Sequence, residues 1–429
     1  MKSVLSFSSP QERLGEGSLY LFMLTAWVAP ALANLALLLM MVACALTPRL
    51  CWRDWKQSPL FWLMLGWNLY LGAALAVQYL GDTVSAQVHL AGSSDFLKLS
   101  LFFVVGWWAR GDERKLKLLL LVALAGVLLN TLKRVEWDTL PAVLQAGGRT
   151  GFGVQIPVAA LLSSSVIVGL VGLQRSCVFS GDKFSPGRSL LWLSVLSISA
   201  LIVFYTQTRT TWLTLVLLLP LMLFVRYFLL TDARLFWPRL LVFVGVLAAV
   251  FIGLSQSEIV SARIDEEMFT IKAILSGDAV PGGSVGLRYH AFVLGVEHWL
   301  QQPWLGWGAG FEAAQLNQEH LPSLLYHLHN TYLEFLVRFG VLGSVILLVA
   351  WLWLHRGLVQ RWRSGLLSAD LALTLVCLEV VFAVWSFTDF QIMRGYCQMY
   401  WFVLGGILLS LNFPQPPANS ISQESPARV

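Results

Sequence analysis

The feature that most constrains this chain is a long series of apolar runs separated by short polar segments. A helix needs about 20 mostly apolar residues to cross the hydrocarbon core of a bilayer. In that environment only helices and closed barrels satisfy every backbone hydrogen-bonding group. Charged residues make up 12% of the chain, against about a quarter in soluble domains. We therefore expect an all-α, polytopic integral membrane protein that sits in a lipid bilayer.

Counting the apolar runs predicts about 12 transmembrane helices. The first run, residues 18–46, is long for one crossing and has Pro30 near its middle, so we expect two short helices that meet at Pro30. The other expected crossings are residues 59–80, 95–109, 115–132, 153–174, 188–205, 209–229, 236–256, 330–354, 368–388 and 396–412. Residues 1–256 then hold transmembrane helices 1–9, and residues 330–412 hold helices 10–12.

The basic residues predict the orientation. They cluster in alternate connections, namely Arg49/Arg53/Lys56, Arg110/Arg114/Lys115/Lys117, Arg175/Lys183/Arg188, Arg226/Arg234/Arg239 and Arg356/Arg361/Arg363. Because Lys and Arg accumulate in cytoplasmic loops, both termini should be cytoplasmic. The net charge of +5 is explained by this pattern, so we expect no nucleic-acid partner. The proline- and serine-containing residues 413–429 are predicted to form a disordered cytoplasmic tail.

One long polar segment, residues 257–329, is predicted to form a loop on the opposite, periplasmic side. Apolar residues recur at roughly helical spacing over 258–276 and 287–301, which favours two amphipathic helices on or near the membrane surface. The glycines at 306, 308 and 310 follow a helical stretch rather than a strand. They therefore predict a tight turn back to the bundle, not a nucleotide-binding loop.

Four ionisable residues from distant parts of the chain should share this outer face: Arg149, Arg209, Arg288 and His329. An arginine at the end of a crossing usually anchors to lipid headgroups, which taken alone is a better account of Arg149 than ligand binding. Arg288 would be ordinary on a solvated helix face. Arg209 is harder to explain structurally, because arginine is disfavoured on the outer side and the connection before it is very short.

His329 stands immediately before an expected crossing. Thr331 and Glu334 match a capping box that would fix the start of the helix. His329 and Asn330 would then lie near the positive end of the helix dipole, where a neutral imidazole is favoured. A neutral histidine is a usable general base, although an interfacial histidine is as often structural. His327 is a weaker candidate for the same role.

Other polar residues on this side carry weaker signals. None of Glu297, Glu312, Glu319, His290, His298 and His320 has the dense spacing of a dedicated metal site, so we expect no metal. Asp389 and Arg394 line the last outer turn and would either orient a ligand or simply form a polar turn.

The sequence also resembles a known family. Trp299–Gly310 (WLQQPWLGWGAG), His329–Leu333 (HNTYL) and the pair Gly340 and Gly343 are similar to the signature region of bacterial O-antigen ligases and the related O-antigen polymerases. The resemblance implies a glycosyltransferase that moves O-antigen polysaccharide from undecaprenyl diphosphate to a sugar of lipid A-core. This would occur on the periplasmic face of the bacterial inner membrane, without a nucleotide sugar, cofactor or metal.

The resemblance assigns catalysis to His329 and diphosphate binding to Arg209 and Arg288. Arg149, Asn330, His327 and Tyr332 are possible supporting residues. Guanidinium groups bind phosphate bidentately and stay charged, so two of them can replace a divalent cation. Their field would also keep His329 neutral, ready to deprotonate the acceptor hydroxyl in a single inverting displacement.

Two alternatives remain. A polymerase would use the same carrier but extend another carrier-linked glycan. A transporter or flippase of lipid-linked glycan needs polar groups through the bilayer midplane, where Glu379 is the one central carboxylate in the predicted crossings.

Overall fold

The computed structural model describes residues 9–81, 86–180, 183–226, 258–278, 283–311, 327–390 and 395–414, with a few single positions between them. Within these residues the chain is helical, apart from one two-stranded antiparallel hairpin of β1 (Phe179–Ser180) and β2 (Lys183–Phe184). The predicted all-α class is confirmed. The expected crossing at 236–256, most of the expected tail, and residues 312–326 lie outside the described residues.

The helices in chain order are α1 (Pro10–Thr25), α2 (Pro30–Leu46), α3 (Pro48–Lys56), α4 (Pro59–Gly81), α5 (Ala86–Lys98), the 3-10 helix η1 (Leu99–Leu101), α6 (Phe102–Ala109), α7 (Glu113–Arg134), α8 (Leu140–Gln145), α9 (Ile156–Gly172), α10 (Gln174–Val178), α11 (Pro186–Thr206), α12 (Arg209–Phe224), α14 (Glu258–Ser276), α15 (Ser284–Gln301), α16 (Thr331–Arg363), α17 (Ala369–Thr388) and α18 (Gly395–Ser410).

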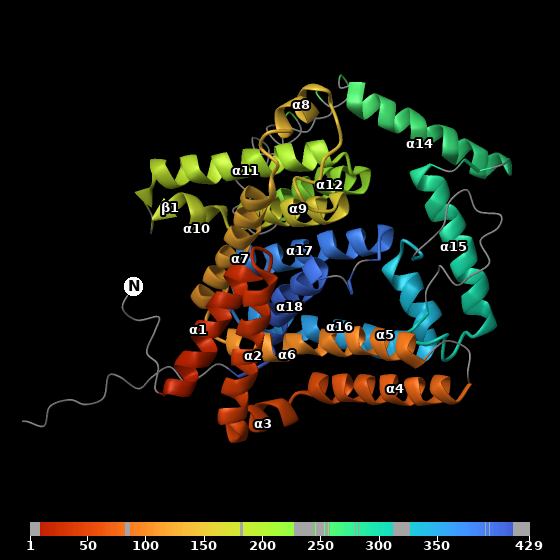
Figure 1. The fold of residues 1–429 in the computed structure, drawn as a ribbon. Coiled ribbons are helices and arrows are strands. Elements are labelled where there is room, and N and C mark those ends of the chain that lie inside the picture. Colours follow the sequence, from red (N-terminus) through yellow and green to blue (C-terminus); the bar gives the residue numbers. More distant parts are fainter. Residues whose placement is uncertain are drawn as a thin grey trace, which may run out of the picture.

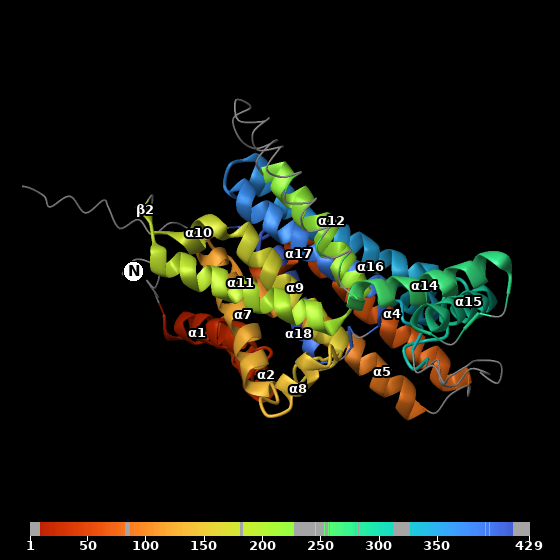
Figure 2. The ribbon, with the colours of Figure 1, turned by 90° about the horizontal axis from the view of Figure 1, so that it is seen from above.

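Helices α4, α11, α12, α16 and α17 run roughly side by side, whereas α7 crosses their direction (Figures 1 and 2). The hairpin β1–β2 lies at one end together with α3, and α14 and α15 lie at the other (Figure 1). We call these the α3 end and the α14 end. The basic connections that contain Arg53 and Lys183 are thus separated from the two amphipathic helices by the length of the bundle.

Six described helices are long and apolar enough to cross a membrane, and a seventh crossing results if the bent pair α2 and α3 counts as one. They are Pro59–Val77, Leu90–Ala109, Glu113–Arg134, Pro186–Thr206, Thr331–Arg363 and Ala369–Thr388. The helices α9 and α12 are apolar but shorter. The chain is therefore a helical membrane protein, and the total of 12 crossings stays a prediction.

The first apolar run divides as expected. Helix α1 ends at Thr25 and α2 begins at Pro30, which occupies the first helical turn, where its missing amide is not needed. The axis then bends by 94° into α3. The core lies where α9, α17 and α18 are enclosed by their neighbours, and the side chains of α9 are buried along almost its whole length.

The glycine turn after α15 locks into an interruption of α16. Gly340 has φ +60° and ψ −168° inside α16, so the helix is broken there. The Gly308 amide donates to the Arg338 carbonyl at 2.7 Å. Gly306 has φ +70°, and a Cβ on it would lie 2.5 Å from the backbone carbon of Arg338. The predicted turn is confirmed, and it places the chain after α15 against the first turns of α16.

We expect Gly306→Ala to destabilise the protein strongly, because a side chain here adds a backbone clash to a left-handed conformation. Gly277→Ala is a matched control, since Gly277 has φ +74° but nothing within 4 Å of a Cβ. The measurement is the apparent melting temperature in detergent. Equal shifts for the two variants would contradict the interlocking described here.

Candidate functional site

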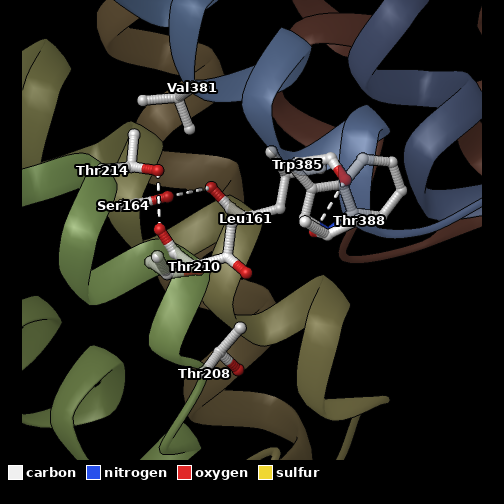
Figure 3. Close-up of a pocket in the computed structure, with 9 residues that line it drawn as sticks. Leu161, Ser164, Thr208, Thr210, Thr214, Val381, Trp385 and Thr388 are labelled. Carbon is white, nitrogen blue, oxygen red and sulfur yellow. Dashed lines mark hydrogen bonds between the residues drawn. The ribbon is translucent and has the colours of Figure 1, made fainter. Parts of the chain in front are cut away.

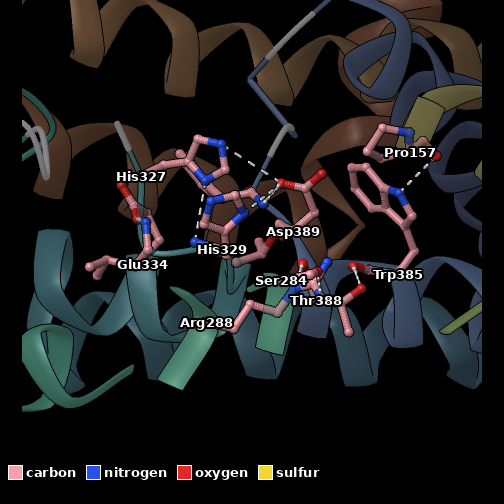
Figure 4. A network of polar contacts seen from close by, with 12 residues as sticks. Pro157, Ser284, Arg288, His327, His329, Glu334, Trp385, Thr388 and Asp389 are labelled. Carbon is pink, nitrogen blue, oxygen red and sulfur yellow. Dashed lines mark hydrogen bonds and ion pairs between the residues drawn. The ribbon is translucent and has the colours of Figure 1, made fainter. Parts of the chain in front are cut away.

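The candidate site lies at the α14 end, where three helices meet (Figure 4). Arg288 projects from α15, and His327 and His329 precede α16. Asp389 follows the last residue of α17. Figure 4 shows the two imidazoles beside the Asp389 carboxylate and Arg288 beside Ser284 and Thr388.

The start of α16 is capped one residue earlier than the sequence predicted. The Asn330 side-chain oxygen accepts hydrogen bonds from the Tyr332 and Leu333 amides at 3.0 and 3.1 Å, so Asn330 is the N-cap. The expected capping box at Thr331 and Glu334 is wrong. An asparagine oxygen next to the helix reaches both free amides, which releases the Thr331 hydroxyl for another partner.

That partner is the end of α17. The Thr331 hydroxyl donates to the Asp389 carbonyl at 2.8 Å, and the Arg288 Nε donates to the Thr388 carbonyl at 3.2 Å. Carbonyls at a helix C-terminus have no partner within the helix. Here they are bonded by side chains of α15 and α16, which fixes Asp389 between the two elements.

The two histidines face the same carboxylate oxygen. His327 Nε2 and His329 Nδ1 each lie 3.8 Å from Asp389 Oδ1, and the two ring centroids are 4.2 Å apart. The His329 amide donates to His327 Nδ1 at 3.2 Å. A neutral His327 must therefore carry its proton on Nε2, toward Asp389.

The same argument orients His329. With Nδ1 facing a carboxylate, the tautomer protonated at Nδ1 is favoured, which leaves Nε2 unprotonated. The backbone of His329 has φ +50°, a conformation that non-glycine residues seldom adopt. Such strain costs on the order of 1–3 kcal/mol and is concentrated at functional sites. The strained backbone therefore marks His329 as a candidate functional residue.

His329 is kept neutral by its surroundings. Burial and the nearby Arg288 guanidinium lower the pKa of His329 from 6.5 to about 4. The predicted neutrality has this physical basis, with burial as the larger cause. Above about pH 4 the Nε2 lone pair is available to accept a proton.

The Arg288 side chain has protein partners for some, but not all, of its guanidinium donors. Besides the bond to Thr388, its Nη1 donates to the Ser284 hydroxyl at 2.9 Å. Burial lowers the pKa of Arg288 and Asp389 raises it, yet an arginine stays charged near neutral pH. The remaining guanidinium donors can bind an anion beside His329.

Arg209 begins α12 and pairs with the Glu267 carboxylate of α14. The sequence pattern did not single out Glu267, which is one of several acids on an amphipathic helix. The guanidinium of Arg209 thus binds an anionic group at the α14 end. The Thr208 residue before it has extended backbone at the helix start.

A narrow pocket rich in hydroxyl groups separates the Arg209 segment from the end of α17 (Figure 3). It is lined by residues of α9, α12 and α17, including Thr210 and Thr388, and by Thr208, which precedes α12. Thr388 also provides the carbonyl that Arg288 binds. The pocket therefore lies between Thr208, next to Arg209 of α12, and Thr388, whose carbonyl is bonded to Arg288 of α15.

Arg149 lies against the connection between α11 and α12. Its Nε donates to the Thr206 carbonyl at 2.9 Å, and the Gln207 side-chain amide donates to the Gly147 carbonyl at 2.8 Å. Gln207 has φ +48°, so the chain turns sharply immediately before Arg209. Arg149 is placed where it supports that turn.

Tyr332 points along the α16–α17 interface, where its hydroxyl donates to the Ala383 carbonyl at 3.0 Å. Of the weaker candidates, Arg394, Glu312, Glu319 and His320 lie outside the described residues. Asp389 is the residue that the sequence most undervalued. An acid directly after an apolar crossing, on the face shared with His329, is the signal that could have found it.

The cluster also has the donors of a metal site. One ligand atom from each of His327, His329 and Asp389 lies within 4.8 Å of the others. Two imidazoles and a carboxylate suit a metal such as zinc. The same three groups also suit proton transfer, so chelation is a necessary control in any assay.

A family model described as O-antigen ligase matches residues 193–348. The matched segment contains Arg209, Arg288 and His329, whereas Arg149 and Asp389 lie outside it. No curated protein matches the chain. The match agrees with the resemblance carried by the Trp299–Gly310 and His329–Leu333 motifs.

Arg288→Gln should raise the pKa of His329 above 4, because it removes the positive charge but leaves the burial. Burial should still hold the pKa below 6.5. The measurement is an NMR titration of ¹⁵N-labelled histidines in detergent. Arg188→Gln, an exposed arginine at the α3 end, is the control and should change nothing. A His329 pKa that stays the same in Arg288→Gln would show that this guanidinium does not act on the imidazole.

Proposed function

We propose that the chain is an O-antigen ligase, because the family model described as O-antigen ligase matches residues 193–348. It would transfer O-antigen polysaccharide from undecaprenyl diphosphate to a sugar of lipid A-core. The observation that carries this proposal is the cluster of Arg288, His329 and Asp389 at the α14 end, two of whose members lie in the matched segment. The family match supports a glycosyltransferase of the ligase or polymerase type, and the cluster supplies groups suited to that reaction.

The site would face the periplasm from the bacterial inner membrane, with both termini cytoplasmic. Support comes from the arrangement of charge, since the basic connections of α3 and the β1–β2 hairpin lie at the end remote from α14 and α15 (Figure 1). Both substrates carry lipid tails. A site at the end of a membrane bundle receives their headgroups while the tails stay in the bilayer.

Arg209 and Arg288 would bind the diphosphate of the carrier. A guanidinium binds phosphate oxygens with two parallel hydrogen bonds, and two such groups neutralise the charge that grows on the leaving diphosphate. The pairing of Arg209 with Glu267 supports this role, because a carboxylate, like a phosphate, presents anionic oxygens to a guanidinium. Donor binding would then replace the Glu267 carboxylate.

His329 would be the general base. Its Nε2 accepts the proton of the acceptor hydroxyl while the acceptor oxygen forms a bond to the anomeric carbon. The bond from that carbon to the diphosphate oxygen breaks on the opposite face, and the configuration inverts. Asp389, near Nδ1, would hold the tautomer and stabilise the imidazolium that forms, as in other carboxylate–histidine pairs.

The polymerase alternative uses the same chemistry and differs in the acceptor. A transporter is less well supported, because two polar residues of the described helices, Glu379 and Asn130, each bond to another side chain. Glu379 accepts a hydrogen bond from the Trp351 indole at 2.9 Å, and Asn130 accepts one from Arg134 at 3.0 Å. Paired groups of this kind stabilise packing and do not by themselves form a polar path.

We expect His329→Ala to lower transfer by about 10²–10⁴-fold, the usual contribution of a general base. The assay contains purified protein, carrier-linked glycan and lipid A-core, and it identifies the glycosylated product. His355→Ala, a histidine near the opposite end of α16, is the control. Glycan added to a second carrier would favour the polymerase. Loss of activity with excess chelator would replace the metal-free mechanism by a metal site at the histidine cluster.

The pairing of Arg209 predicts opposite effects of two substitutions. Arg209→Lys should raise the KM for the donor, because a lysine cannot bind the diphosphate bidentately. Glu267→Gln should lower the donor KM, because the competing carboxylate is removed. Asp265→Asn, on the same helix, is the control. A higher donor KM for Glu267→Gln would mean that the pair is needed to hold α14 and not displaced by substrate.

A further inference from the structure

We propose that a groove at the α3 end binds one anionic phospholipid, in addition to the substrates of the proposed transfer reaction. The groove lies between the start of α4 and the second half of α16 and encloses a volume of about 560 Å³. It is lined by Lys56, Gln57, Pro59, Trp62, Leu63, Val349 and Trp353. It is far from the candidate site along the bundle, so the lipid would not be a substrate.

Apart from Lys56 and Gln57, the walls of the groove are apolar, and they are partly exposed on the surface of the helical bundle. Val349 is 38% exposed and Trp62 is 50% exposed. The Trp62 indole donates to the Lys56 carbonyl at 2.9 Å, which holds the ring at the mouth of the groove. Acyl chains are suited to contact such a wall, because exposing apolar surface to water is unfavourable.

The position of α3 sets the depth of the groove in the membrane. This helix turns by 94° from α2. Its exposed Trp52 packs edge-on against Phe61 and Trp62, with ring centroids 5.9 and 6.4 Å away. Tryptophans concentrate at the level of the lipid headgroups. The mouth of the groove therefore lies where a phosphate group would be.

The charge at this mouth is positive. Lys56 lines the groove, and the Arg356 guanidinium lies 4.7 Å from the centre of the Trp353 ring, which forms its wall. The nearby acid Asp54 is buried and paired with Arg53 and Arg110. It does not neutralise Lys56 or Arg356. Two cations above an apolar groove fit an anionic headgroup above acyl chains.

These features favour an anionic over a zwitterionic lipid. Near a membrane surface each Lys or Arg attracts anionic lipid by about 1 kcal/mol, which corresponds to about fivefold in binding for each cation. With the proposed orientation the lipid would come from the cytoplasmic leaflet. The binding itself does not depend on the reaction catalysed at the other end.

The test is native mass spectrometry of the purified full-length protein from micelles with equal amounts of phosphatidylglycerol and phosphatidylcholine. We expect one phosphatidylglycerol to stay bound preferentially. The double variant Lys56→Gln/Arg356→Gln should lose most of that preference, about tenfold or more. Lys183→Gln/Arg188→Gln is the matched control, since it removes two exposed cations at the same end but away from the groove.

A second measurement locates the lipid. Phosphatidylglycerol with brominated acyl chains should quench tryptophan fluorescence, and Trp62→Phe/Trp353→Phe should reduce that quenching. Equal retention of both lipids, or an unchanged preference in the Lys56/Arg356 variant, would overturn the proposal. The proposal would also be overturned if the protein formed a dimer without bound lipid and the Trp62→Phe/Trp353→Phe variant were monomeric. A second copy of the chain would then occupy the groove.

Discussion

The site depends on the way the end of α17 is held. Two carbonyls there, those of Thr388 and Asp389, accept hydrogen bonds from Arg288 of α15 and from Thr331 of α16. Helix ends always have unsatisfied carbonyls. Bonding them to side chains from two other helices makes one joint out of three segments that lie far apart in the sequence. The Asp389 carboxylate, whose Oδ1 also accepts the Phe390 amide at 2.8 Å, is thereby held 3.8 Å from each imidazole.

A buried ion pair supports this joint from beneath. Glu334, with no exposed surface, binds Arg338 through one oxygen at 2.6 Å and accepts the Leu328 amide with the other at 3.0 Å. Arg338 also donates to the Ala309 carbonyl at 2.5 Å. Buried charges are tolerated when their hydrogen-bonding groups are satisfied. This one ion pair therefore attaches both the glycine turn, through Ala309, and the segment before His329, through Leu328, to α16.

The sequence predicted the parts of this arrangement that depend on local pattern. Apolar runs placed the helices near 59–81 and 369–388, Pro30 placed the break in the first run, and glycine spacing placed the turn at Gly306. The prediction from sequence was wrong where a side chain had two possible hydrogen-bond partners. Thr331 could bond the free amides of its own helix or the carbonyl of Asp389, and that choice depends on α17, which is more than fifty residues away. The position of Asp389 near the two histidines and the pairing of Arg209 with Glu267 likewise depend on tertiary contacts. Residue spacing in a single sequence does not predict such contacts.

The electrostatics of Arg288 are linked to this geometry. Arg288 lies close enough to His329 to lower its pKa, so the group that would bind the leaving diphosphate also keeps the base neutral before reaction. Under the proposed mechanism, the negative charge of a bound diphosphate would offset the guanidinium field, and the imidazole would become more basic when it has to accept a proton. The carboxylate of Asp389 acts in the same direction after transfer, because an imidazolium beside it is stabilised. Under the proposed mechanism, donor binding would therefore prepare the base for the acceptor, which gives a physical reason for an arginine to stand next to a catalytic histidine.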